Sequence, residues 1–69
     1  MTEYEYKNLN PTQFIVYCYF VANTDLRQED LKVKDLNTVA SRIDWKSPVK
    51  ERRKKLISLV KRWKPNAKN

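Results

Sequence analysis

The stretch "NPTQFIVYCYFVAN", residues 10–23, decides the fold because it joins a clear helix start to the longest apolar run of the chain. Asn10 is a favourable N-cap residue, Pro11 suits the first helical position, and Gln13 can close a capping box with Asn10. These signals predict a helix over residues 11–23. We expect this helix to be apolar on most sides and to form the centre of the core.

The same stretch also has the composition of a buried strand, because aromatic and β-branched residues are favoured in sheets. Capping and length favour the helix. Leu9 and Phe14 stand at the two positions of a hydrophobic staple, which adds a further helix signal. We expect Tyr17, Tyr19 and Phe20 to pack in the core rather than to stack on bases.

Two amphipathic segments follow the central one. The first has apolar residues at helical spacing, which predicts a helix over residues 33–43. Its apolar positions are Val33, Leu36, Val39, Ala40 and Ile43. The second begins with Ser47 as N-cap and Pro48 at the first helical position, and Pro65 disfavours helix just before it. We therefore expect a last helix over residues 48–63.

The remaining segments are short. Residues 1–9 are predicted to be a polar N-terminal arm, and residues 65–69 a frayed tail. Between the first two helices, Thr24 or Asp25 could cap a short helix that runs through Leu31, or the segment could be a loop. The chain is therefore expected to be a single all-α domain of three to four helices with a long basic C-terminal helix.

The last helix has two faces when its residues are placed at about 100° each, with Leu56 as the reference. The apolar seam consists of Val49, Leu56, Leu59, Val60 and Trp63. The opposite face carries Lys50, Lys54 and Lys61. Arg52 and Arg53 border the seam, where a packed helix is normally apolar. We infer that the N-terminal half of this helix protrudes from the core. The alternative is that both arginines lay their apolar stems along it.

Charge is distributed unevenly along the chain. Residues 1–41 hold four basic and six acidic residues, and residues 42–69 hold eleven basic and two acidic ones, within a net charge of +7. A one-ended positive field of this kind attracts polyanions, most often nucleic acid and less often anionic membrane. The alternative interpretation is a device for solubility.

The composition argues against catalysis. The chain has no histidine, no glycine and one cysteine, so it lacks the usual imidazole base, an ordinary zinc ligand set and a glycine-rich phosphate loop. We expect no enzymatic activity, no metal, no cofactor and no small-molecule substrate. Cys18 lies in the apolar run and is expected to be a buried, unreactive thiol.

The length of the chain and its longest apolar run allow expectations about stability and localisation. A chain of 69 residues makes one domain and buries only about 60% of its unfolded surface, so we expect stability to be marginal or shared, for instance in a homodimer. The longest apolar run, residues 14–22, is about half of a bilayer span, and the start of the chain has no signal-peptide features. We expect a cytoplasmic protein that neither enters nor binds a membrane.

The stretch "VASRIDWKSPVKERRKKL", residues 39–56, resembles a helix-turn-helix domain without a wing. In that family a small residue of the first helix packs against its partner, here Ala40. An aliphatic residue follows after three positions, here Ile43, and a buried hydrophobic residue follows the turn, here Trp45. The resemblance implies a turn of about three residues and a recognition helix that starts near Ser47. The chain departs from the pattern at Asp44, where the family usually has glycine.

A further departure is Val49, which comes one residue earlier than the inward position that the family pattern expects. The resemblance assigns nucleic-acid contacts to Lys46, Ser47, Lys50, Arg53 and Lys54. Together with the charge pattern, it makes the full predicted set of nucleic-acid-binding residues Arg42, Lys46, Ser47, Lys50, Arg52, Arg53, Lys54 and Lys61.

We therefore hypothesise a small DNA-binding regulator or accessory factor of phage or plasmid type, with duplex DNA preferred over RNA as the partner. A homodimer would suit a protein that reads two half-sites. The alternative is a protein-interaction module or host-directed inhibitor that docks its basic helix on an acidic protein surface.

Overall fold

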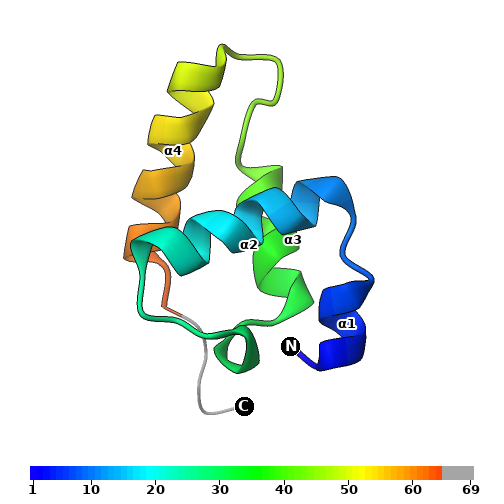
Figure 1. Cartoon of the computed structure of the whole chain (residues 1–69). Coiled ribbons are helices and arrows are strands. Elements are labelled where there is room, and N and C mark those ends of the chain that lie inside the picture. The colour runs from blue at the N-terminus through cyan, green and yellow to red at the C-terminus, as the bar shows by residue number, and fades with distance from the viewer. Residues whose placement is uncertain (65–69) are drawn as a thin grey trace.

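The computed structural model describes residues 1–64, and within them the expected all-α fold is confirmed because every regular element is a helix (Figure 1). The elements are α1 (Glu3–Lys7), α2 (Pro11–Asn23), the 3₁₀ helix η1 (Gln28–Asp30), α3 (Val33–Ser41) and α4 (Val49–Arg62). The frayed tail predicted for residues 65–69 lies outside the described residues. None of the helices in the described part is long and apolar enough to span a bilayer.

Helix α2 has the bounds that the sequence predicts. The Asn10 side chain accepts a hydrogen bond from the Gln13 amide at 2.8 Å, and the Gln13 side chain accepts one from the Asn10 amide at 2.9 Å. At the other end, the Thr24 hydroxyl donates to the Phe20 carbonyl at 2.5 Å. Thr24 therefore terminates α2, and the suggestion that it caps a following helix is wrong.

Helix α2 packs on both α3 and α4 and crosses in front of them in Figure 1. The core that they enclose is formed by Val16, Phe20, Leu31, Leu36, Val39, Ile43, Leu56, Leu59 and Val60. Only Val16 and Phe20 come from α2. Phe20 is thus buried as expected, while Tyr17 and Tyr19 are half-buried against the core.

Helix α2 takes the central position that the sequence predicts, but its apolar surface is buried on one side only. Phe14, Ile15 and Val21 are each between 43% and 49% exposed. Cys18 is also exposed, so the prediction of a buried thiol is wrong. The physical reason is that α3 and α4 both lie on the same side of α2, while α1 reaches only one flank of α2, where the Tyr6 ring packs against the rings of Phe14 and Tyr17.

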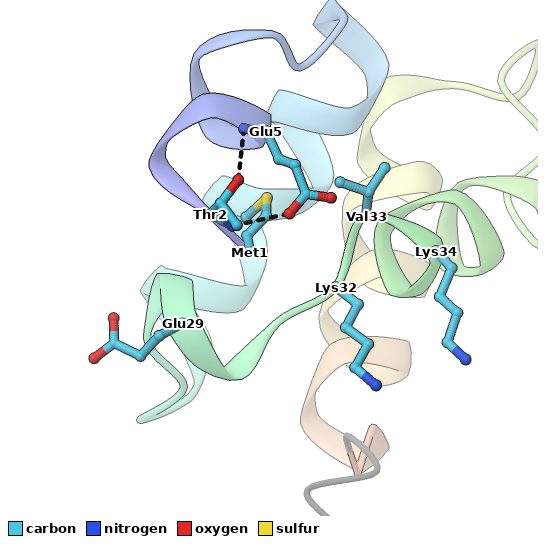
Figure 2. Close-up of a pocket in the computed structure, with 7 residues that line it drawn as sticks. All are labelled: Met1, Thr2, Glu5, Glu29, Lys32, Val33 and Lys34. Atoms are coloured by element: carbon cyan, nitrogen blue, oxygen red, sulfur yellow. Dashed lines mark hydrogen bonds between the residues drawn. The ribbon is translucent and has the colours of Figure 1, made fainter. Parts of the chain in front are cut away.

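Residues 1–9 contain a helix, α1, where a polar arm was predicted. Thr2 and Glu5 form a second capping box, in which each side chain accepts from the other residue's amide, at 3.1 Å and 2.9 Å (Figure 2). The hydrogen bond from the Thr2 amide lowers the pKa of the Glu5 carboxyl. Tyr6 then packs edge-on against Tyr17 of α2, with ring centroids 5.2 Å apart, and burial raises the pKa of Tyr17.

The segment between α2 and α3 is mostly extended, with one turn of 3₁₀ helix at η1. Leu31 is fully buried, which anchors this segment to the core. The Asp35 carboxylate accepts from the Lys32 amide at 3.0 Å and starts α3. Helix α3 ends at Ser41, two residues before the predicted end, although Ile43 remains in the core.

The turn between α3 and α4 runs over seven residues, Arg42–Pro48, and is therefore longer than the three-residue turn that the sequence predicts. Ser47 is not the N-cap of α4. Its hydroxyl donates to the Asp44 carbonyl at 2.6 Å, and its amide donates to the same oxygen at 3.1 Å, so the side chain belongs to the turn. Pro48 takes the N-cap position, and its carbonyl accepts from two amides of the first helical turn.

Asp44 stands in this turn in the place of the family's glycine, a residue that readily adopts positive φ. Among residues 1–64 no residue has positive φ, so the turn does not need one. The seven-residue turn reverses the chain with negative φ throughout. The arrangement of α3 and α4 therefore departs from the short connection implied by the helix-turn-helix resemblance.

Two valines of α2 provide a matched test of this one-sided packing. Val16 is fully buried and Val21 is 49% exposed. We expect Val16→Ala to lower the free energy of unfolding by about 2 kcal/mol through lost burial and a cavity. We expect Val21→Ala to change it by less than about 0.5 kcal/mol, because alanine favours the helix. Urea denaturation followed by circular dichroism measures both values, and equal losses would contradict the described core.

Candidate nucleic-acid interface

The first half of α4 is not covered by the core. The buried residues of this helix are Leu56, Leu59 and Val60, which all lie in its second half. Val49, predicted to belong to the seam, is 58% exposed. Figure 1 shows the cause, because α3 ends beside the middle of α4 and does not reach the start of α4. The predicted protrusion of this half is confirmed.

Most of the exposed basic residues around this half form one group: Lys46 from the turn and Lys50, Arg53 and Lys54 from α4, which we call the basic end. Lys55 is also exposed, but on an ideal helix it lies on another side, about 140° from Lys50. On an ideal helix Lys50, Arg53 and Lys54 are neighbours on one side, since residues three and four apart are adjacent. Four of the predicted binding residues are thus placed together by the fold.

Arg52 differs from its neighbour Arg53. The Arg52 guanidinium is partly buried, and its Nη1 donates a hydrogen bond to the Trp45 carbonyl at 2.6 Å. This contact ties the turn to the helix. Arg53 is exposed and has no such bond among the described residues. Of the two arginines, Arg53 is therefore the one available to a ligand, and it is also the one to which the helix-turn-helix resemblance assigns a contact.

Trp45 fixes the other end of the turn. Its indole Nε1 donates to the Ala40 carbonyl near the end of α3 at 3.0 Å, and the ring packs against the core. Together with the Arg52 contact, this places the turn between the two helices with one hydrogen bond to each. The position of the basic end therefore depends on Trp45, which the sequence identified only as a buried hydrophobic residue.

Arg42 and Lys61 do not join the basic end. The Arg42 guanidinium lies 5.3 Å from the centroid of the Trp63 ring, in a cation–π arrangement just after α4. The Trp63 indole also donates to Asp35 Oδ1 at 3.3 Å. Lys61 is exposed, but it lies about 16 Å along the helix from Lys50 at 1.5 Å per residue. Both residues belong to the opposite end of α4.

The charge of the basic end is not neutralised within the described residues. The ion pairs among residues 1–64 join Lys7 to Glu3 at 3.1 Å and Arg27 to Glu29 at 4.0 Å. Both pairs lie far from α4 in the chain. Helix α4 itself has one carboxylate in its first turn, that of Glu51. The basic end therefore presents a positive potential to solvent, which favours anionic ligands.

A separate hollow of about 620 Å³ lies between α1 and the start of α3. Figure 2 shows that the side chains of Lys32 and Lys34 point away from Thr2 and Glu5, so charged groups do not converge in it. The Glu5 carboxylate is already held by the Thr2 amide. Among residues 1–64 no group of three potential metal ligands of the His, Cys, Asp or Glu type comes together. This hollow therefore has no evident chemistry.

Comparison of the chain with family models, with curated proteins and with solved structures finds no match.

The adjacent arginines allow a matched test of the turn. We expect Arg52→Met to lower the free energy of unfolding by about 1 kcal/mol, because it keeps the apolar stem but loses the bond to the Trp45 carbonyl. We expect Arg53→Met to change it by less than about 0.5 kcal/mol, as is usual for exposed positions. Thermal and urea unfolding measure the two values. A larger loss for Arg53→Met would show that the roles of the arginines are reversed.

Proposed function

We propose that this protein binds duplex DNA without catalysing a reaction, as a small regulator or accessory factor of phage or plasmid type that acts in the cytoplasm. The observation that carries the proposal is the basic end, which is a cluster of exposed cationic side chains on a half-helix that the core leaves uncovered. Phosphate contacts from such residues supply most of the non-specific affinity of proteins for DNA.

The dimensions of α4 suit this role. The protruding part, residues 49–55, is about 10 Å long at 1.5 Å per residue. The major groove of B-DNA is about 12 Å wide and accepts an α-helix, whereas the major groove of A-form RNA is too narrow for side chains to read. The geometry therefore favours duplex DNA over duplex RNA.

The residues of the basic end would divide the work. Lys46, Lys50 and Lys54 are point charges on flexible stems and would contact phosphates. Arg53 carries a guanidinium that can bind guanine through two hydrogen bonds, so it is the candidate for reading a base edge. Arg52 would act indirectly, because its bond to Trp45 holds the turn and with it the position of Lys46.

The proposal does not depend on a standard helix-turn-helix geometry. The seven-residue turn separates α3 from α4 more than that motif does. In our proposal α4 therefore enters the groove by its own first half, with Lys46 of the turn on the adjacent backbone. Two copies on neighbouring half-sites would increase the affinity of the short contact.

One test of the proposal is the salt dependence of the affinity for DNA. If each of the three lysines of the basic end contacts one phosphate, the logarithm of the association constant should fall with the logarithm of salt concentration at a slope of about −3 per bound copy. Electrophoretic shifts of duplex DNA, single-stranded DNA and folded RNA at several salt concentrations measure it. We expect the duplex to bind most tightly. An affinity that does not change with salt would exclude this mode of binding.

A second test concerns the residues. We expect the double variant Lys50→Ala, Lys54→Ala to reduce the magnitude of the salt slope by about 2 and to weaken binding to all sequences alike. The matched control is Lys32→Ala with Lys34→Ala, which removes the same charge from exposed lysines elsewhere. The control should lose much less affinity. If both pairs weaken binding equally, only net charge matters and the basic end is not the site.

A further inference from the structure

The outer face of α2 is the largest feature that the proposed function leaves unused. Helix α2 contains no charged residue, although 33% of the chain is charged. Five residues on the side away from the core are exposed and apolar or only weakly polar: Phe14, Ile15, Cys18, Val21 and Ala22. An exposed, contiguous apolar surface of this kind usually marks a site of interaction.

Along one edge this face borders a groove against α4. One hollow of about 250 Å³ is lined by Ile15 and Tyr19 together with Val49 and Arg53. A second hollow of about 380 Å³ is lined by Cys18, Tyr19 and Ala22 together with Arg53 and Ile57. The two hollows share Tyr19 and Arg53 and therefore lie next to each other along the boundary of the two helices, and we call them together the α2–α4 groove. Trp45 belongs to the lining of the first hollow.

The two walls of the groove are stripes of helical surface. The α2 wall consists of residues at spacings of three, four and seven: Ile15, Cys18, Tyr19 and Ala22. The α4 wall runs from Val49 to Ile57, about 12 Å along the helix. Two neighbouring helices with such ridges can receive the ridge of a third helix between them. An amphipathic helix laid in a groove is held by anchors at just these spacings.

Charge selects the kind of helix. Arg52 and Arg53 both line the groove, and no carboxylate is among the residues that line its two hollows in the described part of the chain. Lys50 and Lys54, the neighbours of these arginines on α4, are exposed. A helix docked here would meet an apolar floor beside cationic side chains, which fits apolar anchors flanked by Asp or Glu.

A second copy of the chain fits less well. In a two-fold symmetric contact the same surface faces itself, so the arginines of one groove would approach those of the other.

We propose that the α2–α4 groove binds an amphipathic helix with an acidic flank, supplied by another protein. Arg53 belongs to both this groove and the basic end, so the acidic helix would compete with DNA for that side chain.

The test uses a synthetic probe and the full chain. The probe is a fluorescein-labelled 16-residue peptide with leucines at helical anchor spacing and glutamates beside them. The first control peptide has the same composition in scrambled order, and the second replaces each glutamate by lysine. We expect the acidic amphipathic peptide to bind at least about tenfold more tightly than either control, measured by fluorescence anisotropy at physiological salt.

Matched variants on α2 locate the site. Ile15 lines the groove and Val21 lines neither hollow, yet they are similarly exposed, at 43% and 49%. We expect Ile15→Asp to weaken binding of the acidic peptide at least about tenfold and Val21→Asp to weaken it less than about twofold. Val49→Asp, on the opposite wall, should act like Ile15→Asp. Circular dichroism checks that each variant is folded.

Three outcomes would overturn the proposal. Binding that survives Ile15→Asp but is lost in the Lys50→Ala, Lys54→Ala variant would be unspecific charge attraction. Equal binding of the lysine peptide would remove the argument from charge. Reversible dimerisation in sedimentation experiments, abolished by Ile15→Asp, would assign the groove to a second copy.

The result can be separated from that for DNA. Ile15→Asp places a carboxylate in the hollow that Arg53 also lines, so this comparison uses the uncharged variant Ile15→Asn. Ile15 is not part of the basic end, so Ile15→Asn should retain the DNA affinity of the unmodified chain while losing the peptide. If the chain bound no DNA at all, the peptide experiment would still decide the role of the groove.

Discussion

The burial of Val16 and Phe20 of α2 between α3 and α4 is the contact on which the rest of the structure depends. These two side chains lie one helical turn apart and are the only fully buried ones that α2 contributes. Because both neighbouring helices use this single stripe, they lie on the same side of α2. The opposite side of α2 is then left to solvent, and its apolar residues become a surface rather than a core.

The length of α3 has a similar consequence for α4. Helix α3 has nine residues and α4 has fourteen, so α3 can cover only part of its partner. The seven residues between them connect the end of α3 to the start of α4. Two hydrogen bonds fix their position, one from the Trp45 indole to the Ala40 carbonyl and one from the Arg52 guanidinium to the Trp45 carbonyl. The basic end is thus displayed by a turn of defined shape.

Local signals in the sequence predicted the helices well and predicted their surroundings less well. The capping box of Asn10 and Gln13 fixed the start of α2, because it depends only on residues three apart. The box of Thr2 and Glu5 carried the same kind of signal for α1 and was available in the sequence. Ser47 was misleading, since a hydroxyl that can cap a helix can equally bond within a turn, as it does with Asp44.

Exposure could not be predicted in the same way. The apolar content of α2 suggested a helix buried on most sides, and whether a partner element exists to cover it is a property of the whole chain. The difference between Arg52 and Arg53 is also tertiary, because it depends on where the Trp45 carbonyl lies. The angular pattern showed that the start of α4 is not a packed surface. The helix-turn-helix resemblance preferred Arg53 as the contact residue, but it gave no indication that Arg52 bonds to the turn.

The charges at the start of α4 are unfavourable for the stability of the isolated chain. An anionic partner would compensate for them. Helix α4 has no side-chain cap at its first turn, and the positive end of its dipole is surrounded by Lys50, Arg53 and Lys54 with only Glu51 to oppose them. Lys50 and Lys54 are also four residues apart, a spacing at which like charges repel. A negatively charged ligand at this end would relieve both effects at once, because it interacts favourably with the dipole and with the cations. The phosphates of DNA and the carboxylates of an acidic helix would each do so, and what distinguishes them is the apolar wall of α2, which only the helix can use.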